Sequence, residues 1–68
     1  MNIQEAIKHL RTSLFLDQKE FGELIGITKS SICNYEHGNR KPRLRVIRKM
    51  VELAKKHKIK IALEDFLA

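Results

Sequence analysis

The sequence predicts an all-α fold, a compact bundle of four to five short helices in a single small domain. Three observations support this prediction. Apolar residues recur at the i, i+3 and i+4 spacing of one helix face in successive segments. Residues that cap helix N-termini precede these segments, and glycines follow two of them. A chain of 68 residues also has little room for long loops, so short helices in close contact are the economical arrangement.

The first two helices are predicted over residues 2–13 and 18–25. The apolar face of the first consists of Ile3, Ile7, Leu10 and Leu14. The apolar face of the second consists of Phe21, Leu24 and Ile25. Asp17 stands before the second helix and Glu20 follows three residues later. Each side chain can therefore accept a hydrogen bond from a backbone N–H that has no partner within the helix. Gly26 then ends the helix, because a left-handed residue is least costly there.

The third helix is expected over residues 29–37, with Thr28 as its N-cap and Gly38 as its stop. The residues predicted to point inward are Ile27, Ile32 and Tyr35. The residues left outside are Lys29, Ser30, Cys33 and Asn34. A helix that shows lysine, serine and asparagine toward its N-terminal end is suited to presentation to a partner, and in a basic protein that partner is expected to be DNA.

A polar, basic loop over residues 38–42 leads to the fourth predicted helix, whose start tolerates Pro42 because the missing N–H is not needed there. The expected core face of this helix consists of Leu44, Ile47, Met50, Val51 and Ala54. Its expected outward face consists of Arg45, Arg48, Lys49, Lys55 and Lys56. Beyond it, residues 59–61 alternate as in a short strand, and residues 63–67 can form one helical turn.

Charge is the second strong signal. The chain has 14 lysines and arginines against 8 acids, a formal net charge of +6 and a pI near 9.8. Ten of these cations follow Gly38, with Glu52 the only acid among them. Such a field favours a polyanionic partner, and the alternative is a solvated helix face that keeps the protein in solution. The single cysteine excludes an internal disulfide and fits a reducing, cytoplasmic setting.

One ordered set of residues carries a resemblance to a known family: Leu10, Arg11, Leu16, Gln18, Glu20, Phe21, Leu24, Gly26, Ile27, Thr28, Ser31, Ile32, Tyr35, Glu36, Gly38 and Pro42. Their arrangement resembles the Cro/C1-type helix-turn-helix family, the small lambda-repressor-like DNA-binding domains. The resemblance covers residues 3–54 and has no gap between positions 18 and 38. It departs at Gly22, where the family usually carries alanine. We expect this glycine to keep the close approach of the helices but to cost about 0.5–1 kcal/mol of helix stability relative to alanine.

The resemblance implies roles for individual residues. The residues expected to read base edges in the major groove are Lys29, Ser30 and Asn34. Lysine can donate to guanine, and asparagine can pair with adenine at two points. The residues expected to contact the DNA backbone are Gln18, Thr28, Asn39, Arg40, Lys41 and Arg43. The alternative for these positions is an ordinary surface or capping role.

The resemblance also implies a structural ion pair. The family commonly pairs an arginine of the first helix with a glutamate that closes the third, and Arg11 and Glu36 occupy those places. We expect this pair to fix the angle between the helices and to take no part in reading DNA.

Residues 1–68 are therefore expected to form one domain, with a core over 3–57 and a tail over 58–68 that is a possible dimerisation element. The predicted function is a sequence-specific DNA-binding transcriptional regulator, by default a repressor, that binds a pseudo-palindromic operator as a homodimer. Two recognition helices about 34 Å apart read successive major-groove faces. The apolar residues that can form the interface, or instead close the core, are Val46, Leu53, Ile59, Ile61, Phe66 and Leu67.

No catalytic site, metal site, cofactor, membrane contact or small-molecule ligand is expected. The carboxylates of the central segment serve caps and surfaces, and the three histidines are too scattered to hold a metal: His9, His37 and His57. Two rival functions remain at this point. One is an antitoxin or protein–protein adaptor with the same fold. The other is a membrane-surface module driven by the basic helix over 43–58, which leaves residues 18–36 unexplained.

Overall fold

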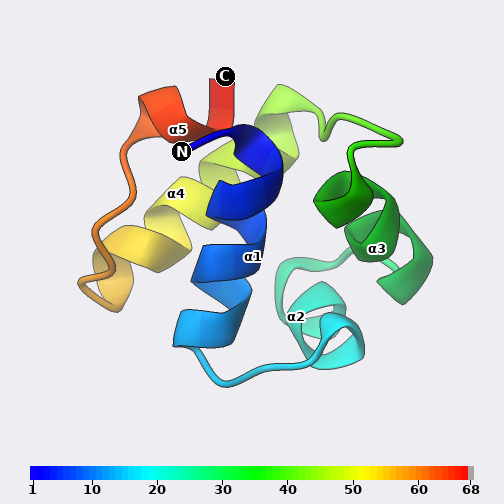
Figure 1. The fold of residues 1–68 in the computed structure, drawn as a ribbon. Helices are drawn as coiled ribbons and strands as arrows, with labels where there is room; N and C mark the ends of the chain where they lie inside the picture. Colours follow the sequence, from blue (N-terminus) through cyan, green and yellow to red (C-terminus); the bar gives the residue numbers. More distant parts are fainter. Residues whose placement is uncertain (68) are drawn as a thin grey trace.

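The computed structural model describes residues 1–67, and these residues form five helices. The helices are α1 (Ile3–Ser13), α2 (Gln18–Ile25), α3 (Lys29–His37), α4 (Leu44–Lys56) and α5 (Leu63–Leu67). In Figure 1, α1 runs through the middle of the molecule, and α2 and α3 lie to its right. Behind it, α4 passes to the lower left, and α5 lies at the upper left. The predicted all-α fold is confirmed.

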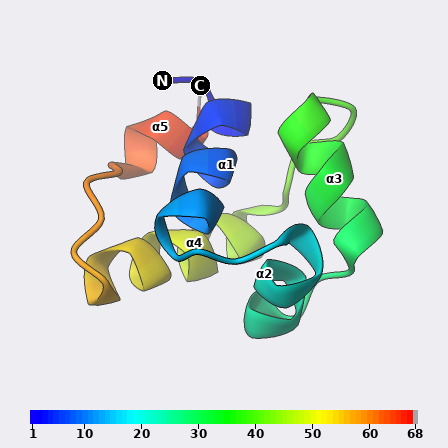
Figure 2. The ribbon, with the colours of Figure 1, turned by 60° about the horizontal axis from the view of Figure 1, so that its bottom comes forward.

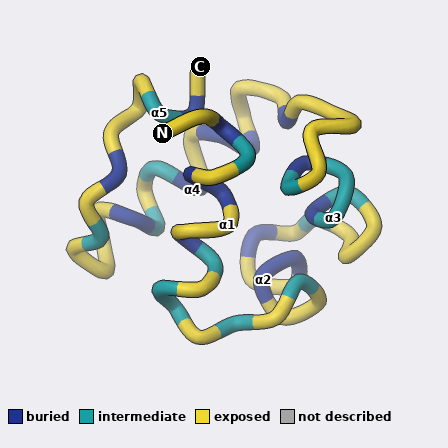
Figure 3. The backbone as a smooth tube through the Cα atoms, viewed as in Figure 1, coloured by how far each residue is buried: buried dark blue, intermediate teal, exposed yellow. Residues whose placement is uncertain are grey.

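A single apolar core connects all five helices. Side chains of α1 occupy its centre, where Ala6, Ile7 and Leu10 are fully buried. Figure 3 shows buried positions alternating with exposed ones along the helices, as expected for amphipathic elements around one core. The fully buried residues from the other helices are Phe21, Ile32, Met50, Ala54 and Phe66.

The second and third helices begin at the predicted capping residues, Asp17 and Thr28, and the first begins after Asn2, which caps it. In α2, the Asp17 side chain accepts from the Glu20 N–H at 2.7 Å, and Glu20 accepts from the Asp17 N–H at 2.9 Å. Asn2 and Glu5 form the same reciprocal arrangement at the start of α1. These bonds satisfy N–H groups that have no partner within the helix, so they favour helix starts at the observed positions.

The helix-turn-helix is formed by α2, a short turn and α3. Gly26 ends α2 in the left-handed conformation, with φ of 77°. The Thr28 hydroxyl then accepts from the Ser31 N–H at 3.1 Å and caps α3. Gly38 ends α3, also with φ of 77°.

Two leucines expected in the core are exposed. Leu24 of α2 is 54% exposed and Leu44 of α4 is 51% exposed. In α2, Phe21 and Ile25 take the core-facing positions, and Leu24 is turned to the side that faces α4. Leu44 is the first residue of α4, before the helix reaches the core, and Val46 is buried in its place.

The tail forms the predicted helical turn, α5, but not the predicted strand, and it contributes two buried residues to the core. Residues 59–62 form no strand; the Ile59 N–H instead donates to the Ala54 carbonyl at 2.9 Å and ends α4. Lys58 adopts the left-handed conformation, φ 56°, that this chain reversal requires. Ile61 and Phe66 are buried against the rest of the core.

Most of the candidate interface residues therefore close the core. Val46, Ile61 and Phe66 are buried, and Leu53 and Ile59 are half-buried against the core. The remaining residue of that set, Leu67, is 62% exposed on α5. Ala68, the last residue of the predicted tail, lies outside the described residues.

Gly22 allows a closer contact between α2 and the following turn than alanine would permit. Its carbonyl accepts from the Ile27 N–H at 2.7 Å. A Cβ atom at this position would lie 2.3 Å from the Ile27 carbonyl oxygen, a backbone atom that cannot move independently. The structure therefore shows the close approach expected of this glycine, and the steric conflict of an added methyl group outweighs the gain in helix propensity that alanine would bring.

We predict that Gly22→Ala lowers the free energy of unfolding by about 1–3 kcal/mol, since the turn must move to admit one methyl group. Urea denaturation followed by circular dichroism measures this change. Glu23→Ala, at the exposed neighbouring position, is the matched control and is expected to change stability by less than about 0.5 kcal/mol. A Gly22→Ala protein as stable as the parent would contradict the steric argument.

Candidate nucleic-acid interface

One face of α3 is polar and open to solvent. Lys29 and Ser30, at the start of the helix, are exposed, and Asn34 is half-buried one turn later. The opposite face carries Ile32, fully buried, and Tyr35, 6% exposed. Burial of one side fixes which side chains the helix presents, so the polar face has a defined orientation.

Two further residues share this polar face. Cys33 and His37 follow Lys29 at i+4 and i+8, so the three lie close to one line along the helix. The His37 Nδ1 atom lies 2.8 Å from the Cys33 carbonyl oxygen and 3.3 Å from the Cys33 Sγ. His37 was not among the residues predicted to contact DNA, although its spacing from Lys29 places it on the same face of the helix.

An ion pair connects α1 to the end of α3. Arg11 Nε donates to Glu36 Oε2 at 2.7 Å, and Arg11 Nη2 donates to Glu36 Oε1 at 3.1 Å. The Arg11 and Glu36 side chains are only 14% and 6% exposed. The hydrogen bond that Arg11 donates to Glu36 raises the pKa of Arg11 against the opposing effect of burial, so the guanidinium stays charged.

The same arginine also holds the connection between α1 and α2. Arg11 Nη1 donates to the Leu16 carbonyl at 3.0 Å, and the Leu16 N–H donates back to the Arg11 carbonyl at 3.3 Å. Through Arg11, the start of the helix-turn-helix is therefore fixed to both α1 and α3.

Gln18 lies where α2 begins, next to this ion pair. Its Nε2 atom donates to Glu36 Oε1 at 3.4 Å, and its side chain is half-buried. An amide nitrogen carries two N–H groups, so one of them stays free of this contact. The carboxylates of Asp17 and Glu20 occupy two other N–H groups of the same helix start.

The connection from α3 to α4 carries most of the remaining predicted contacts. Figure 2 shows this segment leaving the C-terminal end of α3 and crossing to the start of α4. The residues of this segment that were predicted to contact the DNA backbone are all exposed: Asn39, Arg40, Lys41 and Arg43. Pro42, between the last two, is buried and fixes the segment to the protein.

The predicted residues therefore fall into two groups along α3. Thr28, Lys29 and Ser30 lie at its N-terminal end, and the basic connection begins at its C-terminal end. Gln18 lies near the latter group because of its contact with Glu36. A nine-residue helix is about 14 Å long, comparable to the roughly 12 Å width of the DNA major groove.

Chemically, this face can donate hydrogen bonds and neutralise anionic charge. Among residues 1–67 there is no group of three or more histidine, cysteine or acidic side chains placed to hold a metal ion. Within the same described region, no helix is both long and apolar enough to cross a membrane.

Comparison with known families gives a direct match. The helix-turn-helix family model, of the Cro/C1 type, matches residues 7–57. The chain therefore belongs to the Cro/C1-type helix-turn-helix family, a family of DNA-binding transcription regulators and not of enzymes. No curated protein and no solved structure matched the chain.

We predict that Glu36→Gln lowers the free energy of unfolding by about 3–5 kcal/mol, because Arg11 would remain charged and largely buried without its carboxylate. Chemical denaturation measures this loss. Glu64→Gln, at an exposed position of α5, is the matched control and is expected to change stability by less than about 0.5 kcal/mol. Equal stability of the two variants would show that the ion pair does not hold the fold.

Proposed function

We propose that this protein is a sequence-specific transcriptional repressor that inserts α3 into the major groove of operator DNA. In this arrangement, Lys29, Ser30 and Asn34 contact base edges. The residues proposed to contact the DNA backbone are Gln18, Thr28, Asn39, Arg40, Lys41 and Arg43. Membership of the family supports DNA binding in general; the roles of individual residues and the repressor activity are proposed here in addition.

The observation that carries the proposal is the polar face of α3, held in place by burial of the opposite face. Lys29 and Ser30 are exposed at the N-terminal end of the helix, the end that contacts base edges in helix-turn-helix proteins. Exposed cations follow at the other end of α3, where they can bind phosphates on the flank of the groove.

Repression is the simplest regulatory outcome for such a domain. A small domain seated on DNA can exclude other proteins from the same site without a ligand pocket or an activation region. The cytoplasm is the proposed location, since the DNA of a bacterium or phage is accessible there.

We predict that Asn34→Ala removes base preference at one or two positions of each half-site, where discrimination falls by about 1–3 kcal/mol. Selection of bound sequences from a random pool of duplexes measures this loss. Lys29→Ala is expected to alter a different position, and Lys8→Ala, an exposed lysine of α1, is its matched control. Unchanged preferences in both interface variants would favour an adaptor or antitoxin that uses this fold to bind a protein.

We further propose that the protein binds a pseudo-palindromic site as a homodimer joined through α5. Leu63 and Leu67 of this helix are 45% and 62% exposed, and Met1 is 52% exposed. The Asp65 carboxylate accepts from the Ala62 N–H at 3.0 Å and pairs with the terminal amino group at 3.4 Å. These contacts, the first above all, lower the pKa of Asp65 and hold α5 beside the chain's start.

Leu67→Lys is predicted to shift the protein from dimer to monomer in sedimentation equilibrium at micromolar concentration, because each α5 interface would then bury charge. With about four phosphates neutralised per subunit, log K for the dimer should fall with log salt at a slope near −7, and the variant should show about half that slope. Phe15→Lys is the matched control, since Phe15 is 94% exposed on the connection at the opposite end of the molecule from α5 (Figure 1). A Leu67→Lys protein that remains dimeric would exclude α5 as the interface.

A further inference from the structure

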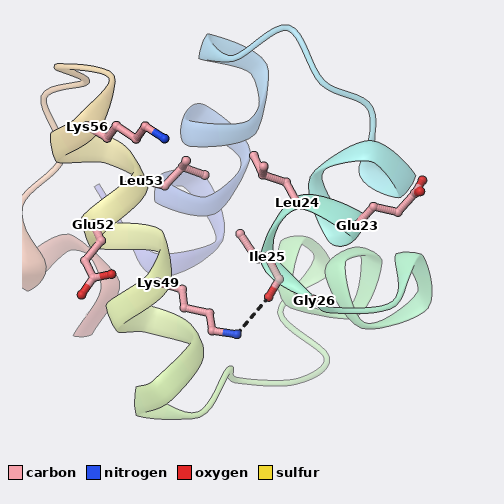
Figure 4. Close-up of a pocket in the computed structure, with 8 residues that line it drawn as sticks. All are labelled: Glu23, Leu24, Ile25, Gly26, Lys49, Glu52, Leu53 and Lys56. Carbon is pink, nitrogen blue, oxygen red and sulfur yellow. Dashed lines mark hydrogen bonds between the residues drawn. The ribbon is translucent and has the colours of Figure 1, made fainter.

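A groove of about 520 Å³ lies between the end of α2 and the outer side of α4. Figure 4 shows Leu24 of α2 and Leu53 of α4 directed toward each other across it. None of the residues that line the groove belongs to the proposed DNA contacts. The groove is therefore a surface that the proposed function does not use.

The floor of this groove is apolar and open to solvent. Leu24 is 54% exposed, although its spacing from Phe21 and Ile25 is typical of a core residue. Leu53 is half-buried against the core and contributes the facing wall. Such a pair of leucines between two helices is suited to receive apolar side chains from another polypeptide.

The rim of the groove carries balanced charge, which is unusual for this protein. Glu23 and Glu52 supply two carboxylates, and Lys49 and Lys56 supply two ammonium groups. Within residues 1–67, none of these four groups is in an ion pair; the Lys49 ammonium lies 3.4 Å from the Ile25 carbonyl. Figure 4 shows the two carboxylates at separate ends of the groove.

These carboxylates also differ from most others in the chain. Five of the eight acidic residues accept hydrogen bonds from backbone N–H groups or from a cation of the same chain: Glu5, Asp17, Glu20, Glu36 and Asp65. The other three are Glu23, Glu52 and Glu64, and two of them line this groove. In a protein of net charge +6, the groove is thus a locally neutral surface on which a second positively charged copy can approach.

We propose that the groove between α2 and α4 is a self-association surface that binds the same groove of a second copy of this chain. In a two-fold interface each patch meets itself, so the carboxylates of one copy can face the ammonium groups of the other. The two leucine pairs then form the apolar centre, and the four charged residues of each copy form the rim.

This surface is separate from the α5 surface proposed for the dimer. Both Figure 1 and Figure 2 show α2 and α5 at opposite ends of the molecule. A chain with two self-association surfaces can join neighbouring dimers. This consequence rests on the proposed function, which supplies the α5 dimer and its binding to operator DNA. Dimers bound at adjacent operators would then occupy DNA cooperatively.

The test uses charge reversal without DNA, so its outcome does not depend on DNA binding. All proteins carry Leu67→Lys, which removes the proposed α5 contact, and association is measured by sedimentation equilibrium up to millimolar concentration. One variant carries Glu23→Lys with Glu52→Lys, and the other carries Lys49→Glu with Lys56→Glu. Each is expected to associate at least about tenfold more weakly than the parent, and an equimolar mixture is expected to recover association.

The matched control is Lys8→Glu with Lys60→Glu, at exposed positions outside the groove. It lowers the net positive charge by the same amount as Lys49→Glu with Lys56→Glu does. Because lower net charge reduces repulsion between copies, this control should associate at least as well as the parent. Leu24→Ser, which leaves all charges in place, should also weaken association, and circular dichroism verifies that each variant is folded. The proposal is overturned if the parent stays monomeric, if both reversals associate like the parent, or if their mixture shows no recovery.

Discussion

The buried ion pair between Arg11 and Glu36 is the contact on which the geometry of the interface depends. The arginine belongs to α1 and the glutamate to α3, and the two are joined by two hydrogen bonds. The arginine also holds the Leu16 carbonyl, and the glutamate accepts from Gln18 at the start of α2. A single charged pair therefore connects α1, α3 and the start of α2. Charges that are largely buried tolerate few alternative arrangements, because each must keep its partner.

The distribution of acids and bases explains how a small domain can be both stable and strongly basic at its surface. Most carboxylates are hydrogen-bonded within the chain, where they cap helices at the surface or hold Arg11. Most cations have no such role and extend into solvent, above all after Gly38. The groove between α2 and α4 is the exception, because its acids and bases are balanced.

Local sequence signals predicted the positions of the helices well. They failed where burial depends on packing between helices. The caps at Asp17 and Thr28 and the stops at Gly26 and Gly38 depend on near neighbours in the sequence, and all four were identified correctly. Leu24 and Leu44 were assigned to the core because periodicity gives a face but not what lies opposite it. An apolar residue of the tail or of α4 has the same sequence pattern whether it closes the core or joins two copies, so the sequence could not distinguish these two roles for the candidate interface residues.

The sequence by itself determined the class of fold, the positions of α2 and α3 and the polar character of the exposed face of α3. It could do so because capping, helix periodicity and net charge are properties of short segments. Only the tertiary structure decided that the residue at position 22 must lack a Cβ, that Ile61 and Phe66 close the core, and that Leu24 and Leu53 face each other across a groove. These outcomes depend on distances between atoms far apart in the chain, and no local pattern contains those distances.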